Sequence, residues 1–152
     1  MVSEPEYRRG RSVFAALHVH LVFVTKYRKG ALTDEMLTTC EQVMRSVCDD
    51  FGSRLVEFDG EGDHVHLLID YPPTIQVSKL VNSLKGVSAR RLRDQYREWV
   101  NRHSMNGHLW SPSYFAASCG GAPISIIRQY IEQQRRPPRA PGRPKSMRSH
   151  EN

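Results

Sequence analysis

The order in which strand-like and helix-like segments alternate is the strongest constraint on how this chain folds. Residues 13–25 are rich in Val, Phe and Leu with partial alternation, which predicts a first strand. Residues 34–50 repeat apolar side chains at helical spacing after a capping start, so a helix is expected there, ending near Gly52. Two short β-type segments, 54–58 and 64–70, flank an acidic stretch that contains glycine, and together they predict a hairpin.

The second half of the chain continues this alternation. A long helix is predicted from about residue 75 to 96, with an apolar inner side and a basic outer side. Residues 97–107 are typical of a polar loop, 109–118 of a fourth strand, and 123–134 of a helix with Pro123 in its first turn. The order β-α-β-β-α-β plus a C-terminal helix predicts an α+β, ferredoxin-like fold, an antiparallel sheet with helices on one face.

Length and composition indicate one soluble domain. A chain of 152 residues can bury a real core, and no apolar run approaches the ~20 residues of a membrane span. The N-terminus lacks the apolar core of a signal peptide, so a cytoplasmic protein is expected. Cys40, Cys48 and Cys119 form no CxxC motif and are expected to be buried thiols.

The positive charge of the chain is concentrated in its last residues. Residues 135–152 hold six basic residues and one acidic residue, and so supply +5 of the formal net charge of +6. Four prolines in this tail disfavour a helix and predict a disordered basic arm. Such an arm can add salt-dependent affinity for phosphates, or it can simply keep the protein soluble. Residues 1–12 are interpreted as an N-terminal extension.

Two histidines, His64 and His66, stand two positions apart in the second strand of the predicted hairpin. A strand turns alternate side chains to one face, so the two would lie roughly 6–7 Å apart at the backbone and could share one cation. His18 and His20 have the same spacing in the first strand, so spacing alone does not choose between the pairs. His64 follows an acidic loop where a ligand could enter, whereas His18 lies within an apolar run. We therefore interpret His18 and His20 as structural.

Tyr130 and Gln134 are four residues apart in the predicted last helix, and such positions are neighbours on a helix surface. Tyr130 lies at the edge of an apolar stripe, where packing is the ordinary role of a tyrosine. Gln134 offers an uncharged oxygen that a hard divalent cation accepts. Together the histidine pair and this pair suggest a metal-assisted tyrosine nuclease, in which one pair holds a metal and the other supplies the attacking oxygen.

Five segments carry a more specific pattern. They are HLVFVTKYRKG (20–30), GDHVHLLIDYPP (62–73), SKLVNSLKGVSARRLR (78–93), LWSPSYFAAS (109–118) and IIRQYIEQQ (126–134). In this order they resemble the single-tyrosine transposases of the HUH nuclease superfamily, the TnpA type of minimal bacterial insertion sequences that move as single-stranded DNA. The resemblance covers residues 13–134. It implies that His64-Val65-His66 is the His-hydrophobic-His motif, that Tyr130 is the nucleophile, and that Gln134 is the third metal ligand.

The resemblance also implies a reaction and its partners. The expected activity is cleavage and rejoining of single-stranded DNA at insertion-sequence ends through a 5′-phosphotyrosine intermediate, assisted by Mg²⁺ or Mn²⁺ and without a nucleotide cofactor. Two imidazoles also suit Zn²⁺, so the residues alone leave the ion open. The family pattern further implies DNA hairpins as ligands, a homodimer with composite active sites, and a nucleoid-associated location in a bacterium or archaeon. Gly120 and Gly121 precede the tyrosine helix and are a hypothetical hinge.

Contacts with DNA are predicted from charge and aromatic character. The candidate phosphate contacts are basic residues after the first strand and on the long helix, each of which could equally be a solvated charge: Lys26, Arg28, Lys29, Lys85, Arg90 and Arg91. Tyr27, Trp110 and Tyr114 could stack on unpaired bases, although core packing is the more natural role of Trp110 and Tyr114.

Two alternative functions stay open at this point. The first is an HUH nuclease of another process, such as a replication initiator, a relaxase or a domesticated relative that binds palindromes. The second is a non-catalytic binder of DNA hairpins. The presence of both histidines together with Tyr130 and Gln134 favours a catalyst over such a binder.

Overall fold

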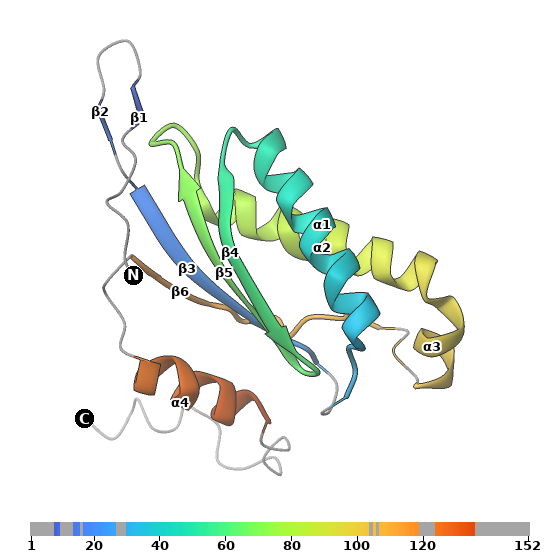
Figure 1. The fold of residues 1–152 in the computed structure, drawn as a ribbon. Helices are drawn as coiled ribbons and strands as arrows, with labels where there is room; N and C mark the ends of the chain where they lie inside the picture. Colours follow the sequence, from blue (N-terminus) through green and yellow to red (C-terminus); the bar gives the residue numbers. More distant parts are fainter. Residues whose placement is uncertain are drawn as a thin grey trace, which may run out of the picture.

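The main sheet is antiparallel and four-stranded, with the strand order β4-β5-β3-β6 (Figure 1). The computed structural model describes residues 8–9, 14–15, 17–26, 30–103, 105, 107–118 and 124–135, with backbone alone for 8–9, 14–15, 124–127 and 135. The strands are β3 (Leu17–Val24), β4 (Arg54–Glu61), β5 (His64–Tyr71) and β6 (Phe115–Ser118). This order, with helices after the first and third strands of the sheet, confirms the predicted ferredoxin-like α+β fold.

The N-terminal strand prediction was only partly right. The first strand of the main sheet begins at Leu17, whereas β2 (Phe14–Ala15) pairs with β1 (Arg8–Arg9) in a separate two-stranded sheet. The rest of the predicted N-terminal extension and the basic tail beyond Arg135 lie outside the described residues, as do Gly120, Gly121 and Cys119.

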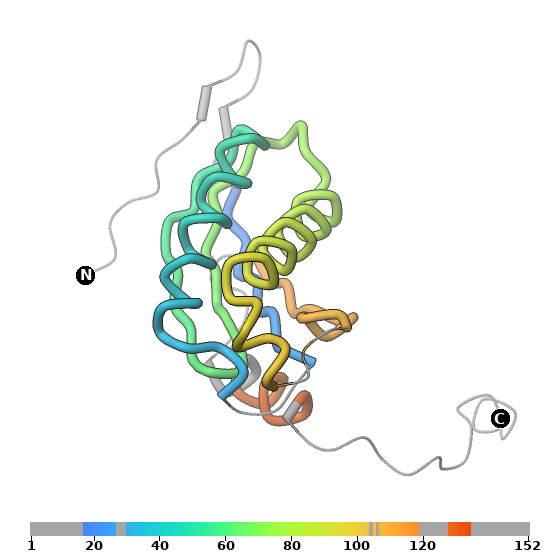
Figure 2. Tube along the Cα trace, turned by 90° about the vertical axis from the view of Figure 1, so that its right-hand side faces the viewer, coloured from blue at the N-terminus to red at the C-terminus, as the bar shows by residue number. Residues whose placement is uncertain are grey.

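Helix α1 (Asp34–Asp50) has the predicted bounds, and its ends explain why. The Thr33 hydroxyl accepts a hydrogen bond from the Met36 backbone N–H at 3.2 Å, which caps the first turn. Beyond the last turn, Gly52 takes a φ of +63°, a conformation that glycine adopts without strain. Helix α2 (Val77–Gln95) lies beside α1 (Figure 2) and begins two residues later than predicted.

The segment predicted as a polar loop contains a short helix, α3 (Arg97–Arg102). Only Val100 of this helix is buried, so its sequence has no apolar stripe from which a helix could be predicted. Tertiary contacts hold it instead: the Trp99 indole N–H donates to the Ala31 carbonyl oxygen at 2.9 Å. Contacts of this kind override a weak local helix propensity.

The core lies between the sheet and the paired helices α1 and α2 (Figure 1). The strand residues that face these helices are fully or almost fully buried: Val19, Leu21, Phe23, Val65, Leu67 and Ile69. Cys40 and Cys48 are buried on α1, which confirms the prediction for these two, and burial raises the pKa of both thiols to about 12. Among the described residues, none of the helices is long and apolar enough to cross a membrane.

Helix α4 (Ile124–Arg135) lies on the opposite face of the sheet from α1 and α2 (Figure 1, orange). Ile131 is buried there against Val22 and Val24 of β3, and Phe115 and Tyr130 pack against this small cluster. The sheet therefore separates the predicted tyrosine helix from the main core.

The predicted fourth strand is shorter than expected. Only its last four residues form β6, while Trp110 pairs with Thr25 through an isolated bridge. Trp110 is buried, as predicted, and its indole N–H donates to the Ser88 hydroxyl at 3.0 Å. The expected core packing of Tyr114 was wrong, because its side chain is exposed. Its ring meets Phe23 edge-on, with centroids 6.4 Å apart.

Candidate active site

His64 and His66 lie on the face of the sheet that carries α4. In the register of β3 and β5, His64 stands opposite Val24 and His66 opposite Val22, and both valines contribute to the α4 cluster. Val65 between them points to the main core and is fully buried. The predicted same-face arrangement of the two histidines is therefore present.

The turn before His64 is tighter than predicted and is firmly held. Strand β4 continues to Glu61, so the turn consists of Gly62 and Asp63. The Asp63 carbonyl oxygen accepts the Thr25 N–H, and the Gly62 carbonyl oxygen accepts the Leu32 N–H, both at 2.9 Å. A side chain at Gly62 would lie 3.0 Å from the Gly30 backbone nitrogen, so this close approach favours glycine. The backbone that presents His64 is thus fixed from two sides.

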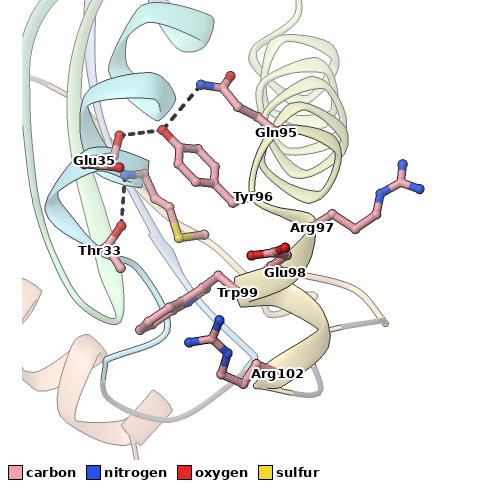
Figure 3. A pocket seen from close by; sticks show the side chains of 9 residues that line it. Thr33, Glu35, Gln95, Tyr96, Arg97, Glu98, Trp99 and Arg102 are labelled. Atoms are coloured by element: carbon pink, nitrogen blue, oxygen red, sulfur yellow. Dashed lines mark hydrogen bonds between the residues drawn. The ribbon is translucent and has the colours of Figure 1, made fainter.

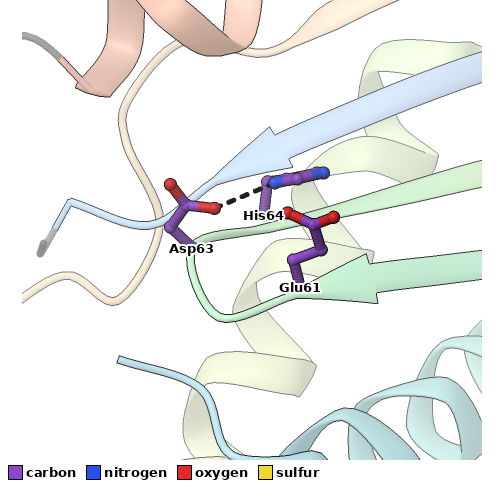
Figure 4. Close-up of side chains that lie close together, drawn as sticks. All are labelled: Glu61, Asp63 and His64. Atoms are coloured by element: carbon purple, nitrogen blue, oxygen red, sulfur yellow. Dashed lines mark hydrogen bonds and ion pairs between the residues drawn. The ribbon is translucent and has the colours of Figure 1, made fainter. Parts of the chain in front are cut away.

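Asp63 orients the ring of His64. The Asp63 side chain is almost fully buried, and its Oδ1 lies 2.9 Å from Nδ1 of His64 (Figure 4). A carboxylate at Nδ1 holds the proton on that nitrogen, so the lone pair of Nε2 is left for a cation. Glu61 lies beside them, and ligand atoms of Glu61, Asp63 and His64 are all within 4.8 Å of one another. Carboxylates with imidazole form a donor set that accepts Mg²⁺ or Mn²⁺.

His66 has a different neighbour. Its Nε2 lies 3.1 Å from Nδ1 of His20 on β3, and the ring centroids are 5.3 Å apart with the ring planes 27° from parallel. Burial lowers the pKa of His66, and His20 adds to this effect, while Asp59 and Glu57 on β4 oppose it. A lowered pKa favours the neutral imidazole, which is the form in which a histidine binds a metal. Of the two histidines interpreted as structural, His20 touches the predicted site and His18 stands opposite Asp70.

Tyr130 and Gln134 lie one turn apart on α4, as predicted, and both bind the segment before β6. The Tyr130 hydroxyl is 3.0 Å from the Ser113 hydroxyl, and Gln134 Oε1 accepts the Ser111 hydroxyl at 3.0 Å. Burial raises the pKa of Tyr130, and the Ser113 hydrogen bond opposes this shift. Tyr130 and Gln134 therefore lie on the same face of the sheet as the two histidines. These two hydrogen bonds go to Ser113 and Ser111 and not to His64 or His66.

A cavity of about 290 Å³ separates the β4–β5 turn from α4. Glu61 and His64 line one side, and Arg128, Ile131 and Glu132 line the other. In this arrangement α4 faces His64 with charged side chains. Four residues near this site were not predicted as site residues: Glu61, Asp63, Ser111 and Ser113. The signal for Asp63 was its place directly before His64, whereas the serines had none.

The predicted DNA contacts fall into different environments. Lys85 and Arg90 line a groove of about 380 Å³ between α2 and residues 108–112, together with Arg93 and His108. Lys85 is half-buried: its Nζ donates to the Ser111 and Pro112 carbonyl oxygens at 2.7 and 3.4 Å, and burial lowers its pKa. The other candidates are either exposed or outside the described residues: Lys26 and Arg91 are exposed, and Tyr27, Arg28 and Lys29 are not described.

Another cavity, of about 420 Å³, opens beside the start of α1, the end of α2 and α3 (Figure 3). Tyr96 lines this cavity, and its hydroxyl is 2.6 Å from the Thr39 hydroxyl and donates to the Glu35 carbonyl oxygen at 3.1 Å. None of the predicted site residues lines this cavity.

The four-stranded sheet carries a histidine pair on one face, and α4 with Tyr130 packs against that face, as expected for a protein of the HUH class. The family model described as "Transposase IS200 like" matches residues 13–134, and the chain belongs to this family. It is thus a transposase of the kind encoded by small insertion sequences, in agreement with the resemblance read from the sequence.

Individual relatives agree with this placement. The ISDra2 transposase TnpA of Deinococcus radiodurans is 31% identical over 129 residues, which are 85% of this chain and 91% of the relative. The IS200 transposase of Salmonella typhimurium is 30% identical over 115 residues, or 76% of this chain and 74% of the relative. A crystal structure of a candidate transposase from Deinococcus radiodurans superposes with a TM-score of 0.74 at 33% identity, covering 84% of this chain and 97% of that one.

Proposed function

We propose that this transposase cleaves and rejoins single-stranded DNA at the ends of an insertion sequence, with residues 13–134 as the catalytic unit. The observation that carries the proposal is the pairing of His64 and His66 on the same sheet face as α4, with each histidine ring held by a neighbour. If the two histidines only packed in the structure, neither the buried Asp63 carboxylate beside His64 nor the helix with Tyr130 on the same face would be required.

In this proposal His64, His66 and Gln134 hold the divalent cation, and Asp63 keeps Nε2 of His64 available for it. Two imidazole nitrogens, one amide oxygen and the nearby carboxylates suit Mg²⁺ or Mn²⁺. When bound, the cation supplies charge that polarises the scissile phosphate and stabilises the leaving oxygen. Gln134 Oε1 accepts the Ser111 hydroxyl, and its second lone pair is the one that would bind the cation.

Tyr130 acts as the nucleophile. Its hydroxyl proton is released to solvent, its oxygen bonds to phosphorus, and the bond from phosphorus to the 3′ oxygen breaks, so that this oxygen takes up a proton. The products are a 5′-phosphotyrosine and a free 3′-OH, which retain the phosphodiester energy for rejoining. The ordinary pKa of a tyrosine is ~10 and burial raises that of Tyr130, so the hydroxyl is protonated at neutral pH and attack requires an activated phosphate.

We infer that DNA hairpins near the element's ends are the recognised ligands and that the basic groove beside α2 contributes phosphate contacts through Arg90 and Arg93. The active form in this proposal is a homodimer in which the tyrosine helix of one chain serves the histidine pair of the other. A hinge at Gly120 and Gly121 would permit that exchange.

The direct experiment mixes the protein with single-stranded DNA from the flanks of its own gene in Mg²⁺ or Mn²⁺ and looks for a covalent adduct on a denaturing gel. The wild type should form the adduct, and Tyr130→Phe should form none. Tyr114→Phe is the matched control, because Tyr114 is an exposed tyrosine on the adjoining segment. An adduct that persists in Tyr130→Phe would overturn Tyr130 as the nucleophile. No adduct with the wild type would overturn the assignment and favour a hairpin-binding protein.

The composite site is tested by mixing two inactive proteins, Tyr130→Phe and His64→Ala. If α4 of one chain serves the histidines of its partner, the mixed dimer contains one intact site and adduct formation returns. If each helix serves its own histidines, the mixture stays inactive.

A further inference from the structure

His20 contacts the predicted metal ligand His66, and the contact is specific in its geometry. Nδ1 of His20 and Nε2 of His66 are 3.1 Å apart, and the ring planes differ by 27°. Across the strand pair His20 stands opposite Leu68 and His66 opposite Val22, so the two rings meet diagonally on one face of the sheet. His20 lies on β3, an inner strand paired on both sides, which keeps its backbone in place.

A hydrogen bond between two neutral imidazoles requires one N–H and one lone pair, which leaves two arrangements. If His20 Nδ1–H donates, the lone pair of His66 Nε2 is used, and its Nδ1 carries the proton. His66 then has no free lone pair for a cation. If His66 Nε2–H donates to His20 Nδ1, the lone pair of His66 Nδ1 is free. The contact therefore decides whether His66 can be a ligand.

We propose that His20 is a positioning residue for His66: its Nδ1 accepts the Nε2–H of His66, which fixes the ring and leaves the Nδ1 lone pair of His66 for the divalent cation. This inference rests on the proposed function, in which His66 is a metal ligand. His20 then does for His66 what Asp63 does for His64, because each partner holds a proton on one ring nitrogen and frees the other.

The two positioning partners differ in charge. Asp63 presents a buried carboxylate to His64, whereas His20 presents a second imidazole to His66. A neutral partner adds no negative charge near the bound phosphate. To accept the hydrogen bond at Nδ1, His20 must itself carry its proton on Nε2. A non-polar side chain at position 20 cannot meet this demand, whereas asparagine can place an oxygen acceptor about where Nδ1 stands.

The first test is the tautomer of His66 in the metal-free protein, measured by long-range ¹H–¹⁵N correlation spectra of histidine-labelled full-length chain at neutral pH. The expected result is a proton on Nε2 of His66 in the wild type. His20→Leu should leave a mixture of tautomers, and His20→Asn should restore the Nε2–H form. A proton on Nδ1 of His66 in the wild type would overturn the proposal.

The second test is Mn²⁺ binding followed by electron paramagnetic resonance. Loss of a residue that orients a ligand lowers metal affinity about 10–100-fold, so His20→Leu should fall in that range and His20→Asn should recover most of it. His18→Leu is the matched control, because His18 lies two residues away on the same face and stands opposite Asp70. Thermal melting of each variant checks folding.

Three outcomes separate this inference from the function on which it rests. Wild type that binds Mn²⁺ and forms the DNA adduct, with His20→Leu binding Mn²⁺ equally well, would overturn the inference alone. Nitrogen couplings from three imidazoles rather than two would also overturn it, since His20 would then be a ligand. Wild type that neither binds Mn²⁺ nor forms an adduct would overturn the proposed function, and the inference with it.

Discussion

The two faces of the sheet contrast sharply although the same strands build both. On β5, Val65, Leu67 and Ile69 point to α1 and α2 and are fully buried, while His64 and His66 point to the α4 face and stay partly exposed. One face is aliphatic and dense, and the other carries imidazoles beside a small apolar cluster. The alternation of a strand thus lets the fold depend on one face and the chemistry on the other.

Two neighbouring leucines on β5 point to opposite faces, so truncating each in turn compares what the two faces contribute to stability. Leu67→Ala leaves a cavity in the main core and should destabilise the protein by about 2–5 kcal/mol. Leu68 is adjacent on β5 but lies on the partly open face, so Leu68→Ala should cost less than about 1.5 kcal/mol. Urea unfolding of both variants measures the difference. Equal losses would show that the α4 face is as important to stability as the main core.

The second prediction concerns metal-dependent stability, which should reside on the histidine face alone. A cation that binds the folded state at about 100 times its Kd stabilises it by about 2.7 kcal/mol. Mn²⁺ should therefore raise the Tm of the wild type, and His64→Ala should remove most of that rise. His103→Ala serves as the control, because His103 stacks on Trp99 of α3, away from this face. A wild-type Tm that does not respond to Mn²⁺ would contradict the metal site.

Much of the fold could be predicted because the local signals agreed with the tertiary structure. Helix α1 has a capping residue, a periodic apolar face and a glycine at its end, and its bounds were predicted correctly. Helix α3 was missed because its stability comes from contacts such as the Trp99 bond to Ala31, which no local pattern encodes. Strand β6 was overestimated because Trp110 lies in a bridge rather than in a continuous strand.

The site was predictable only in part, for a similar reason. Spacing along the chain predicts that the two residues of each pair share one face. This holds for His64 and His66 on a strand and for Tyr130 and Gln134 on a helix. The contact of His20 with His66 depends on the register between β3 and β5, which the sequence does not specify. The docking of Tyr130 and Gln134 on two serines depends on where α4 lies against the sheet.

The third prediction concerns the link between the two faces. Lys85 on α2 donates to the carbonyl oxygens of residues 111 and 112, and Ser111 in turn holds Gln134 of α4. Lys85→Met should cost about 1.5 kcal/mol, the low end for bonds of a charged donor, because Lys85 is only half-buried. Arg90→Met should change stability by less than about 0.5 kcal/mol and weaken DNA binding at low salt instead. If Lys85→Met instead weakened DNA binding without changing the free energy of unfolding, Lys85 would be a DNA contact and not a structural link.

The smallest effect is expected at the tyrosine itself. The Ser113 hydrogen bond partly offsets the burial that raises the pKa of Tyr130, so Ser113→Ala should raise this pKa further. Burial favours the neutral phenol in the folded state, so the stability it confers is present below the ordinary pKa of ~10 and is lost as the pH rises through the raised value. Absorbance titration of Ser113→Ala, with Tyr130→Phe to assign the signal, measures the shift. Ser113 is exposed, so the accompanying loss of stability at pH 7 should be no more than about 0.5 kcal/mol. A lowered Tyr130 pKa in Ser113→Ala would mean that the tyrosine side chain had moved from its buried position to a more polar environment. The docking of α4 on this face would then depend on the single hydroxyl of Ser113.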